Sequence, residues 1–364
     1  HSPHAGGLID VVERALAKLE RAMGKLDDSD GYITDLRLSL ERIHREACAR
    51  TRPDPAALAK RLFTIAMKTE LEVFWDAPME YRDILGETGL AAYRRLAEPE
   101  WAQVPARAER SSVLGESFRI RHLMESWARA SGDLEQVVAV LSRDLSSAWN
   151  YLRVAEACAA AGAEDQALHW AELGLEAFPQ RTDRRLREFA AGQYHRLGRS
   201  EDAMRQIWAV FEDQPTETSY QRLKEHARRI GAEEPWRERA IAHLRAVIER
   251  TGTGSHSTLV EIFLAEGDVE AAWREAQTGS CSPSLLERVA DARRAQFPEE
   301  SAVAFLRLAS EVMADIRDGR YEQVVAWLEK ARSAPGFAAE LARLRTEYKV
   351  KRNFMKLLAE RFPA

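Results

Sequence analysis

A histidine and a cysteine four residues apart are the side chains of this sequence best placed to share a ligand. His44 and Cys48 lie in a stretch with helical apolar spacing, so both project from one face of the predicted helix. An imidazole and a thiolate at this spacing can bind a metal ion, but a structural zinc site needs four ligands. Because the sequence supplies no second pair, we expect no metal here and interpret the two residues as an ordinary half-buried helix face.

The other reactive side chains are too dispersed to predict a catalytic site. The chain has nine histidines and three cysteines, with no pair of cysteines at metal-binding or redox spacing. A catalytic triad is assembled only in space, so the sequence alone cannot assign one. The glycines of Thr251–Ser255 follow a predicted helix and not a strand, which indicates a linker instead of a phosphate-binding loop. We therefore predict no catalytic residues, no cofactor and no enzymatic activity.

Composition narrows the class of protein further. The chain has 53 Lys and Arg against 58 Asp and Glu residues, a net charge of −5, and so lacks the basic character of most nucleic-acid-binding proteins. No apolar run reaches the roughly 18 residues of a membrane-spanning helix. The widely spaced cysteines are typical of reduced thiols, so we expect a cytoplasmic protein. The start at His1–Gly7 has no initiator Met, and we interpret it as a processing boundary.

Two local basic clusters keep an alternative open. They span residues 181–187 and 343–356. Each is either a surface for nucleic acid or another acidic partner, or the solvated face of a helix. The second cluster also carries an apolar stripe, which favours docking of that helix on its neighbours.

The elements that would position these residues are helices throughout. Alanine is abundant, and apolar residues recur at spacings of three and four along the chain. The sequence therefore predicts an all-α fold. We expect an N-terminal helical bundle over residues 8–108, antiparallel helix pairs over 115–335, and one long basic amphipathic capping helix over 336–362.

Glycines recur at a regular interval in the central region. Intervals of 30, 36, 33 and 36 residues separate five glycines, at positions 132, 162, 198, 231 and 267. Each glycine closes a predicted helix, and in most units the next helix opens with a small residue on its inner face. A period in this range indicates a solenoid of helix pairs, in which each pair buries its apolar face against the next.

The segment Ala148–Pro179 carries the pattern most clearly. Ala155 and Ala167 are the small residues at which the two helices of this unit can approach closely, and the next unit, Asp183–Pro215, repeats the register with Ala191 and Ala203. These units resemble tetratricopeptide repeats, which implies a right-handed stack of helix pairs with a concave face.

Later units are degenerate, around Gly267 and Gly319, and Ser282–Pro298 predicts an extra helix between them. The closing segment Tyr348–Leu358 is similar to the helical region of uncharacterised bacterial proteins, some of which carry an upstream SWIM-type zinc finger. The zinc ligands of that finger do not occur in this chain, so the similarity implies no zinc site.

The repeats predict a function of binding. In tetratricopeptide arrays the early positions of each first helix face the concave side, which implies a groove lined by Trp149, Leu152, Glu156, Glu188 and His195. We predict a non-enzymatic scaffold that binds a peptide or partner domain, because rigid stacked helices limit the ordering entropy lost on binding. The alternatives are a nucleic-acid-associated accessory protein that uses the basic clusters, and a regulatory subunit of an enzyme.

Overall fold

The computed structural model describes residues 5–23, 31–106, 117–180, 182–251, 256–278, 281–314 and 320–363. Within these ranges the ordered elements are all helices, and no residue forms a strand, which confirms the all-α prediction. Some predictions fall outside the described residues in whole or in part. They concern the chain start, the boundary near residue 108, Arg181, the linker at 252–255 and Gly319.

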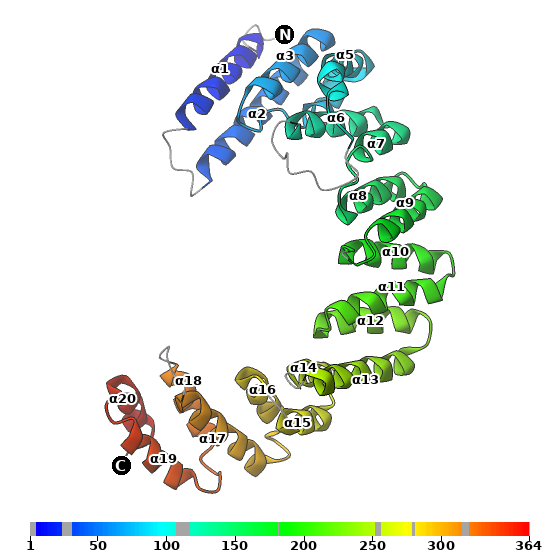
Figure 1. Ribbon diagram of the computed structural model, residues 1–364. Helices are drawn as coiled ribbons and strands as arrows, with labels where there is room; N and C mark the ends of the chain where they lie inside the picture. The colour runs from blue at the N-terminus through cyan, green and yellow to red at the C-terminus, as the bar shows by residue number, and fades with distance from the viewer. Residues whose placement is uncertain are drawn as a thin grey trace. The chain divides into compact units, whose positions relative to one another are not determined.

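The chain forms two compact units, His1–Arg199 and Ser200–Ala364 (Figure 1). The helices of the first unit are α1 (Ala5–Met23), α2 (Tyr32–Thr51), α3 (Pro55–Lys68), α4 (Ala77–Glu80), α5 (Arg82–Ala102), α6 (Phe118–Ser131), α7 (Leu134–Leu141), α8 (Ala148–Ala160), α9 (Glu164–Ala177) and α10 (Arg184–Arg196). Those of the second unit are α11 (Ser200–Asp213), α12 (Glu217–Arg229), α13 (Glu233–Thr251), α14 (His256–Glu266), α15 (Val269–Thr278), α16 (Pro283–Arg293), α17 (Pro298–Ala314), α18 (Tyr321–Lys330), α19 (Phe337–Glu347) and α20 (Arg352–Arg361).

Local chemistry accounts for where many helices begin and end. The Asp54 carboxylate accepts a hydrogen bond from the backbone N–H of Ala57, with Pro55 at the first helical position of α3. Thr216 and Ser219 form a reciprocal capping box at the start of α12. The five periodic glycines all have φ between 65° and 78°, the left-handed conformation that reverses the chain between helices.

One apolar core holds the N-terminal helices together. It runs from Ile9 in α1 to Val140 in α7, and it includes Tyr81 and Tyr93, both fully buried. The first two helices that follow the predicted bundle, α6 and α7, thus contribute to the core of that bundle. The boundary itself lies outside the described residues.

The remaining helices of each unit pack as stacked neighbours. In the first unit α8 packs on α9, α9 on α10, and α8 also on α10. Ala155 of α8 and Ala167 of α9 have no exposed surface, as the close-approach prediction requires. In the second unit α12 contacts both α13 and α14, and α14 contacts both α15 and α16. The extra helix predicted within Ser282–Pro298 is present as α16.

The prediction of one long C-terminal helix is wrong. Two helices, α19 and α20, stand in its place, and the chain leaves the helical conformation over Tyr348–Lys351. The break lets the Tyr348 ring meet the ring of buried Phe354 edge to face, at a centroid distance of 6.2 Å. An unbroken helix would keep six residues of rise between these two positions, about 9 Å along the axis.

Two helical glycines provide a matched test of helix packing. A Cβ atom on Gly174 of α9 would lie 2.6 Å from Cβ of Tyr151 and 2.8 Å from Leu186, whereas one on Gly192 of α10 would meet nothing within 4 Å. We expect Gly174→Ala to lower the free energy of unfolding by about 1–3 kcal/mol through overpacking. Gly192→Ala raises it by up to about 1 kcal/mol, since alanine favours helix. Urea unfolding measures both; equal effects of the same sign would contradict the packing assignment.

A histidine–aspartate pair ties α6 to the segment before α4. Nε2 of His122 lies 3.0 Å from Oδ1 of Asp76, and the His122 ring lies against Trp75. The hydrogen bond to Asp76 raises the pKa of His122 above its usual 6.5, against an opposing effect of burial. The same bond lowers the pKa of Asp76 below its usual 3.8. The folded state therefore favours the charged form of both groups.

Stability should depend on pH through this pair. The contribution of His122 to the free energy of unfolding is complete below pH 6.5, and it is lost as pH rises through the raised pKa of the folded state. The contribution of Asp76 is complete above pH 3.8, and it is lost as pH falls through the lowered pKa of the folded state. Urea unfolding of the wild type and of Asp76→Asn, measured from acidic to alkaline pH, tests this dependence. The stability difference should shrink as the medium becomes alkaline, and a difference independent of pH would contradict the assignment.

Candidate functional site

His44 and Cys48, for which the sequence predicts no metal, belong to a buried polar cluster in the N-terminal bundle. Nδ1 of His44 lies 2.9 Å from the Tyr81 hydroxyl and 3.7 Å from Sγ of Cys48, and Nε2 lies 3.2 Å from Oε1 of Glu13. Arg61 donates in turn to the Glu13 carboxylate. No group of side chains in the described ranges has the composition and proximity of a metal site.

This order of thiol, imidazole and carboxylate resembles that of a nucleophilic site, but its environment opposes the chemistry. His44 and Cys48 have no exposed surface. Burial, with a smaller effect of the Glu13 charge, raises the pKa of the Cys48 thiol to about 12, whereas an activated cysteine has a lowered pKa. We therefore interpret the cluster as a hydrogen-bonded packing element that joins α1, α2 and the segment of Tyr81.

The predicted groove residues of the first unit differ in how far they are exposed. Trp149 is 38% exposed, and the Arg185 guanidinium lies over its ring at 4.0 Å. Glu156 is exposed, while Glu188, which pairs with Arg184, and His195 are half-buried. These residues come from α8 and α10, which pack against each other.

Leu152 does not belong to a groove, contrary to the prediction. It is 1% exposed, so its side chain is packed in the interior. Three residues along a helix rotate a side chain by about 300°, so Leu152 points about 60° away from Trp149, toward the core.

The chain pairs the described cations of the first basic cluster more completely than those of the second. In the first, Arg184 pairs with Glu188, and Arg185 binds the Asp183 carboxylate through two nitrogens. In the second, Arg343 pairs with Glu340 and Glu347, and Arg345 donates to the Phe362 carbonyl. The remaining basic residues of the second cluster are exposed; these are Lys349, Lys351, Arg352 and Lys356. Cations that are already paired add little to the binding of a nucleic acid backbone.

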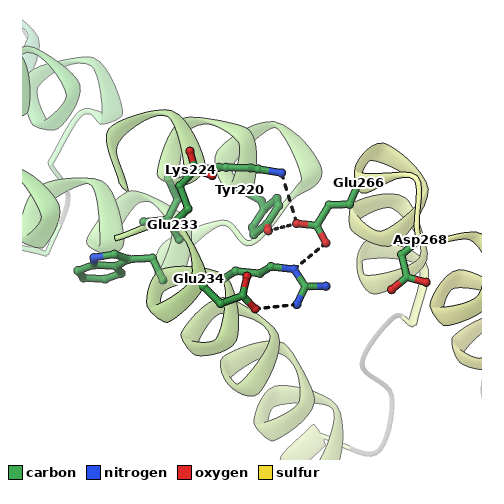
Figure 2. Close-up of a pocket in the computed structure, with 9 residues that line it drawn as sticks. Tyr220, Lys224, Glu233, Glu234, Glu266 and Asp268 are labelled. Atoms are coloured by element: carbon green, nitrogen blue, oxygen red, sulfur yellow. Dashed lines mark hydrogen bonds and ion pairs between the residues drawn. The ribbon is translucent and has the colours of Figure 1, made fainter. Parts of the chain in front are cut away.

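A cavity in the second unit is the best-formed candidate site. It has a volume of about 290 Å³, and α12, α13, the end of α14 and the turn before α15 line it (Figure 2). Its centre is the Glu266 carboxylate, toward which the side chains of Tyr220 and Lys224 point in Figure 2. Asp268, the residue before α15, lies on the far side of Glu266 and also lines the cavity.

Two hydrogen bonds and an ion pair hold Glu266 in place. The Tyr220 hydroxyl and Lys224 Nζ, at 3.6 Å, meet Oε1, and Arg237 Nε lies 2.8 Å from Oε2. The Glu266 side chain is 8% exposed, and both of its cationic partners are less than one-third exposed. Arg237 also reaches Glu234, at 3.4 Å. One carboxylate thus joins residues of α12 and α13 to the end of α14.

The electrostatics of this network act on two of its members. Burial, and next the hydrogen bond to Glu266, raise the pKa of Tyr220, so its hydroxyl remains a donor at neutral pH. Burial alone would lower the pKa of Arg237, but the hydrogen bond and charge of Glu266 outweigh it and raise that pKa. Tyr220 therefore meets Glu266 as a neutral donor, and Arg237 meets it as a cation.

A second cavity adjoins the first. It has a volume of about 570 Å³ and shares Arg237 and Asp268 with its neighbour. It runs along α13, whose Ile241, Ala242 and Ala246 contribute apolar surface, and reaches α14 and α15. We call the two cavities together the α12–α15 groove.

Sequence reasoning missed this groove. The signal available was the departure from the repeat at Glu233–Trp236, where acidic residues and a proline replace the usual small-residue opening. A second was the run Glu266–Asp268, which places two carboxylates around a chain-reversing glycine. Nothing in either segment predicts that Glu266 meets Tyr220, 46 residues earlier.

The comparisons with known proteins leave the function open. No family model matches the chain, and no curated protein matches it either. Among solved structures, a human IFIT1 dimer with PPP-AAAA is 13% identical, with 100% of this chain and 94% of that chain covered, at a TM-score of 0.27. A circular tandem repeat protein with a novel repeat topology is 18% identical, with 97% and 82% covered, at a TM-score of 0.15. At these TM-scores neither likeness supports an argument about function.

Among the described residues, no helix combines the length and hydrophobicity that crossing a membrane requires.

The Glu266 network can be tested through stability. Glu266→Gln should lower the free energy of unfolding by about 1–3 kcal/mol, because it removes the carboxylate from Lys224 and leaves Arg237 only its contact with the exposed Glu234. Glu233→Gln is the matched control. Glu233 pairs with Arg228 on the surface, with 41% of its side chain exposed, so its change should stay within about 0.5 kcal/mol. Equal losses in urea unfolding would show that Glu266 is not the structural centre.

Proposed function

We propose that the protein is a non-enzymatic binding scaffold that takes up a peptide segment of a partner protein on its helical-repeat surface. The α12–α15 groove is the principal binding site in this proposal. The observation that supports it most is the adjacency of two cavities on one face of consecutive helices, with a shared wall of Arg237 and Asp268. A short peptide can lie along such a surface and contact several helices at once.

The groove is built in a way that favours binding over catalysis. Its most buried carboxylate, Glu266, is occupied by hydrogen bonds from Tyr220 and Arg237 and by an ion pair with Lys224. Its apolar strip on α13 consists of a few small and aliphatic side chains, so a partner can approach the helix closely. Because the Glu266 network links α12, α13 and α14, the groove needs little ordering when a ligand binds.

The repeat pattern supports the same proposal. We propose that the helix pairs of the central region are tetratricopeptide-like units, and that their exposed faces are the binding surface. Trp149, Glu156, Glu188 and His195 then form a second contact surface, confined to the first unit. Trp149 supplies exposed aromatic area of the kind found in interface hot spots.

Filling the groove tests the proposal. A peptide is first selected from a random displayed library with the wild-type chain, and its affinity is then measured by fluorescence anisotropy. Ala246→Trp places an indole on the exposed groove face of α13 and should weaken binding about tenfold or more, because the ligand would have to displace it.

Ala342→Trp is the matched control, since Ala342 is an exposed helical alanine of α19 outside the groove. Its affinity should equal that of wild type. If selected peptides bind all three chains equally, or if no peptide is selected, the α12–α15 groove is not the binding site. Trp149→Ala is measured in the same way. If it weakens peptide binding and Ala246→Trp does not, the binding site lies in the first unit.

A further inference from the structure

We infer that the ligand of the α12–α15 groove is a basic amphipathic helical segment, with Lys or Arg on one face and apolar residues on the other. This inference rests on the proposed function and adds to it the chemistry of the partner. It follows from the charges that line the groove, from how far the cations present neutralise them, and from the position of the apolar strip on α13.

Acidic side chains outnumber basic ones along the groove. Six carboxylates line the two cavities, those of Glu233, Glu234, Glu238, Glu249, Glu266 and Asp268. Three cations line them, those of Lys224, Arg237 and Arg245. A concave surface with an excess of one sign of charge attracts ligands of the opposite sign.

The cations present do not remove this excess. Lys224 and Arg237 both bind Glu266, and Arg237 also reaches Glu234. Glu233 pairs with Arg228, a residue outside the lining of the two cavities. Glu238, Glu249 and Asp268 then share the lining with one further cation, Arg245, so the carboxylates still outnumber the cations. Glu238 and Glu249 lie on α13 with exposed side chains, and Asp268 uses one oxygen to accept the backbone N–H of Ala271. The groove therefore retains carboxylate oxygens at both ends of α13 and at the start of α15.

The apolar strip determines the form of the ligand. Ile241, Ala242 and Ala246 lie on the groove side of α13 between Glu238 and Glu249, and Arg245 lines the cavity beside the two alanines. The alanines allow the backbone of another helix to approach, and a carboxylate at each end of the strip can pair with a cation of that helix. Apolar contact along the strip and charge contact at its ends together match an amphipathic helix.

The test uses two synthetic helical peptides, one of leucine, alanine and lysine in amphipathic order and one with every lysine replaced by glutamate. Each is labelled with fluorescein and titrated with the full chain, and fluorescence anisotropy is recorded. The lysine peptide should bind, and its affinity should fall as salt is added, since screening weakens exposed charge pairs. The glutamate peptide should not bind.

Charge reversal then locates the site. The double variant Glu238→Lys, Glu249→Lys should bind the lysine peptide about tenfold more weakly or worse. The double variant Glu212→Lys, Asp213→Lys makes the same change of net charge at exposed positions of α11 outside the groove, and its affinity should stay near that of wild type. Equal weakening in both variants would show attraction to the whole acidic chain, and would overturn the inference.

Two further outcomes separate this inference from the proposed function. If the glutamate peptide binds as well as the lysine peptide, and Ala246→Trp weakens it, the groove binds peptides but the basic character of the ligand is wrong. If Ala246→Trp changes the affinity of neither peptide nor of any library peptide, the groove itself fails as a site.

Discussion

The architecture depends on how closely two helices can approach at the positions where they cross. Ala155 and Ala167 have no exposed surface, and Gly174 lies so near Tyr151 that even a methyl group would collide. Larger side chains at neighbouring positions fill the remaining space and form the apolar layer between pairs. Since each pair leaves one apolar face uncovered, the next pair within the same unit covers it.

Polar contacts are added to this rule beside the groove. Ala227 of α12 and Ala240 of α13 have no exposed surface. The longer side chains of Tyr220 and Arg237 reach from the same two helices to the Glu266 carboxylate at the end of α14. A cavity lies beside these contacts, so the polar network stabilises the junction and lines the cavity at the same time.

Much of the fold could be predicted from the sequence because its determinants are local. The small residues at crossing points and the glycines that reverse the chain act within one or two turns, so spacing alone reveals them. Leu152 was misplaced because a rotation of about 60° around the helix separates the exposed face from the core. The break at Tyr348–Lys351 depends on the contact of Tyr348 with Phe354, and the groove depends on partners 46 residues apart. Neither pairing leaves a periodic signal.

The contact pattern of the second unit has a consequence for its biosynthesis. In the described part of that unit, every pair of helices in substantial contact is at most two helices apart in chain order. Each helix can therefore pack on its neighbours without a segment that is distant in the sequence. Topologies with such local contacts fold quickly. The Glu266 network is complete once the chain has been synthesised as far as the end of α14. The cavity around Glu266, whose lining ends at Asp268, can therefore be assembled on the ribosome before the C-terminal helices exist.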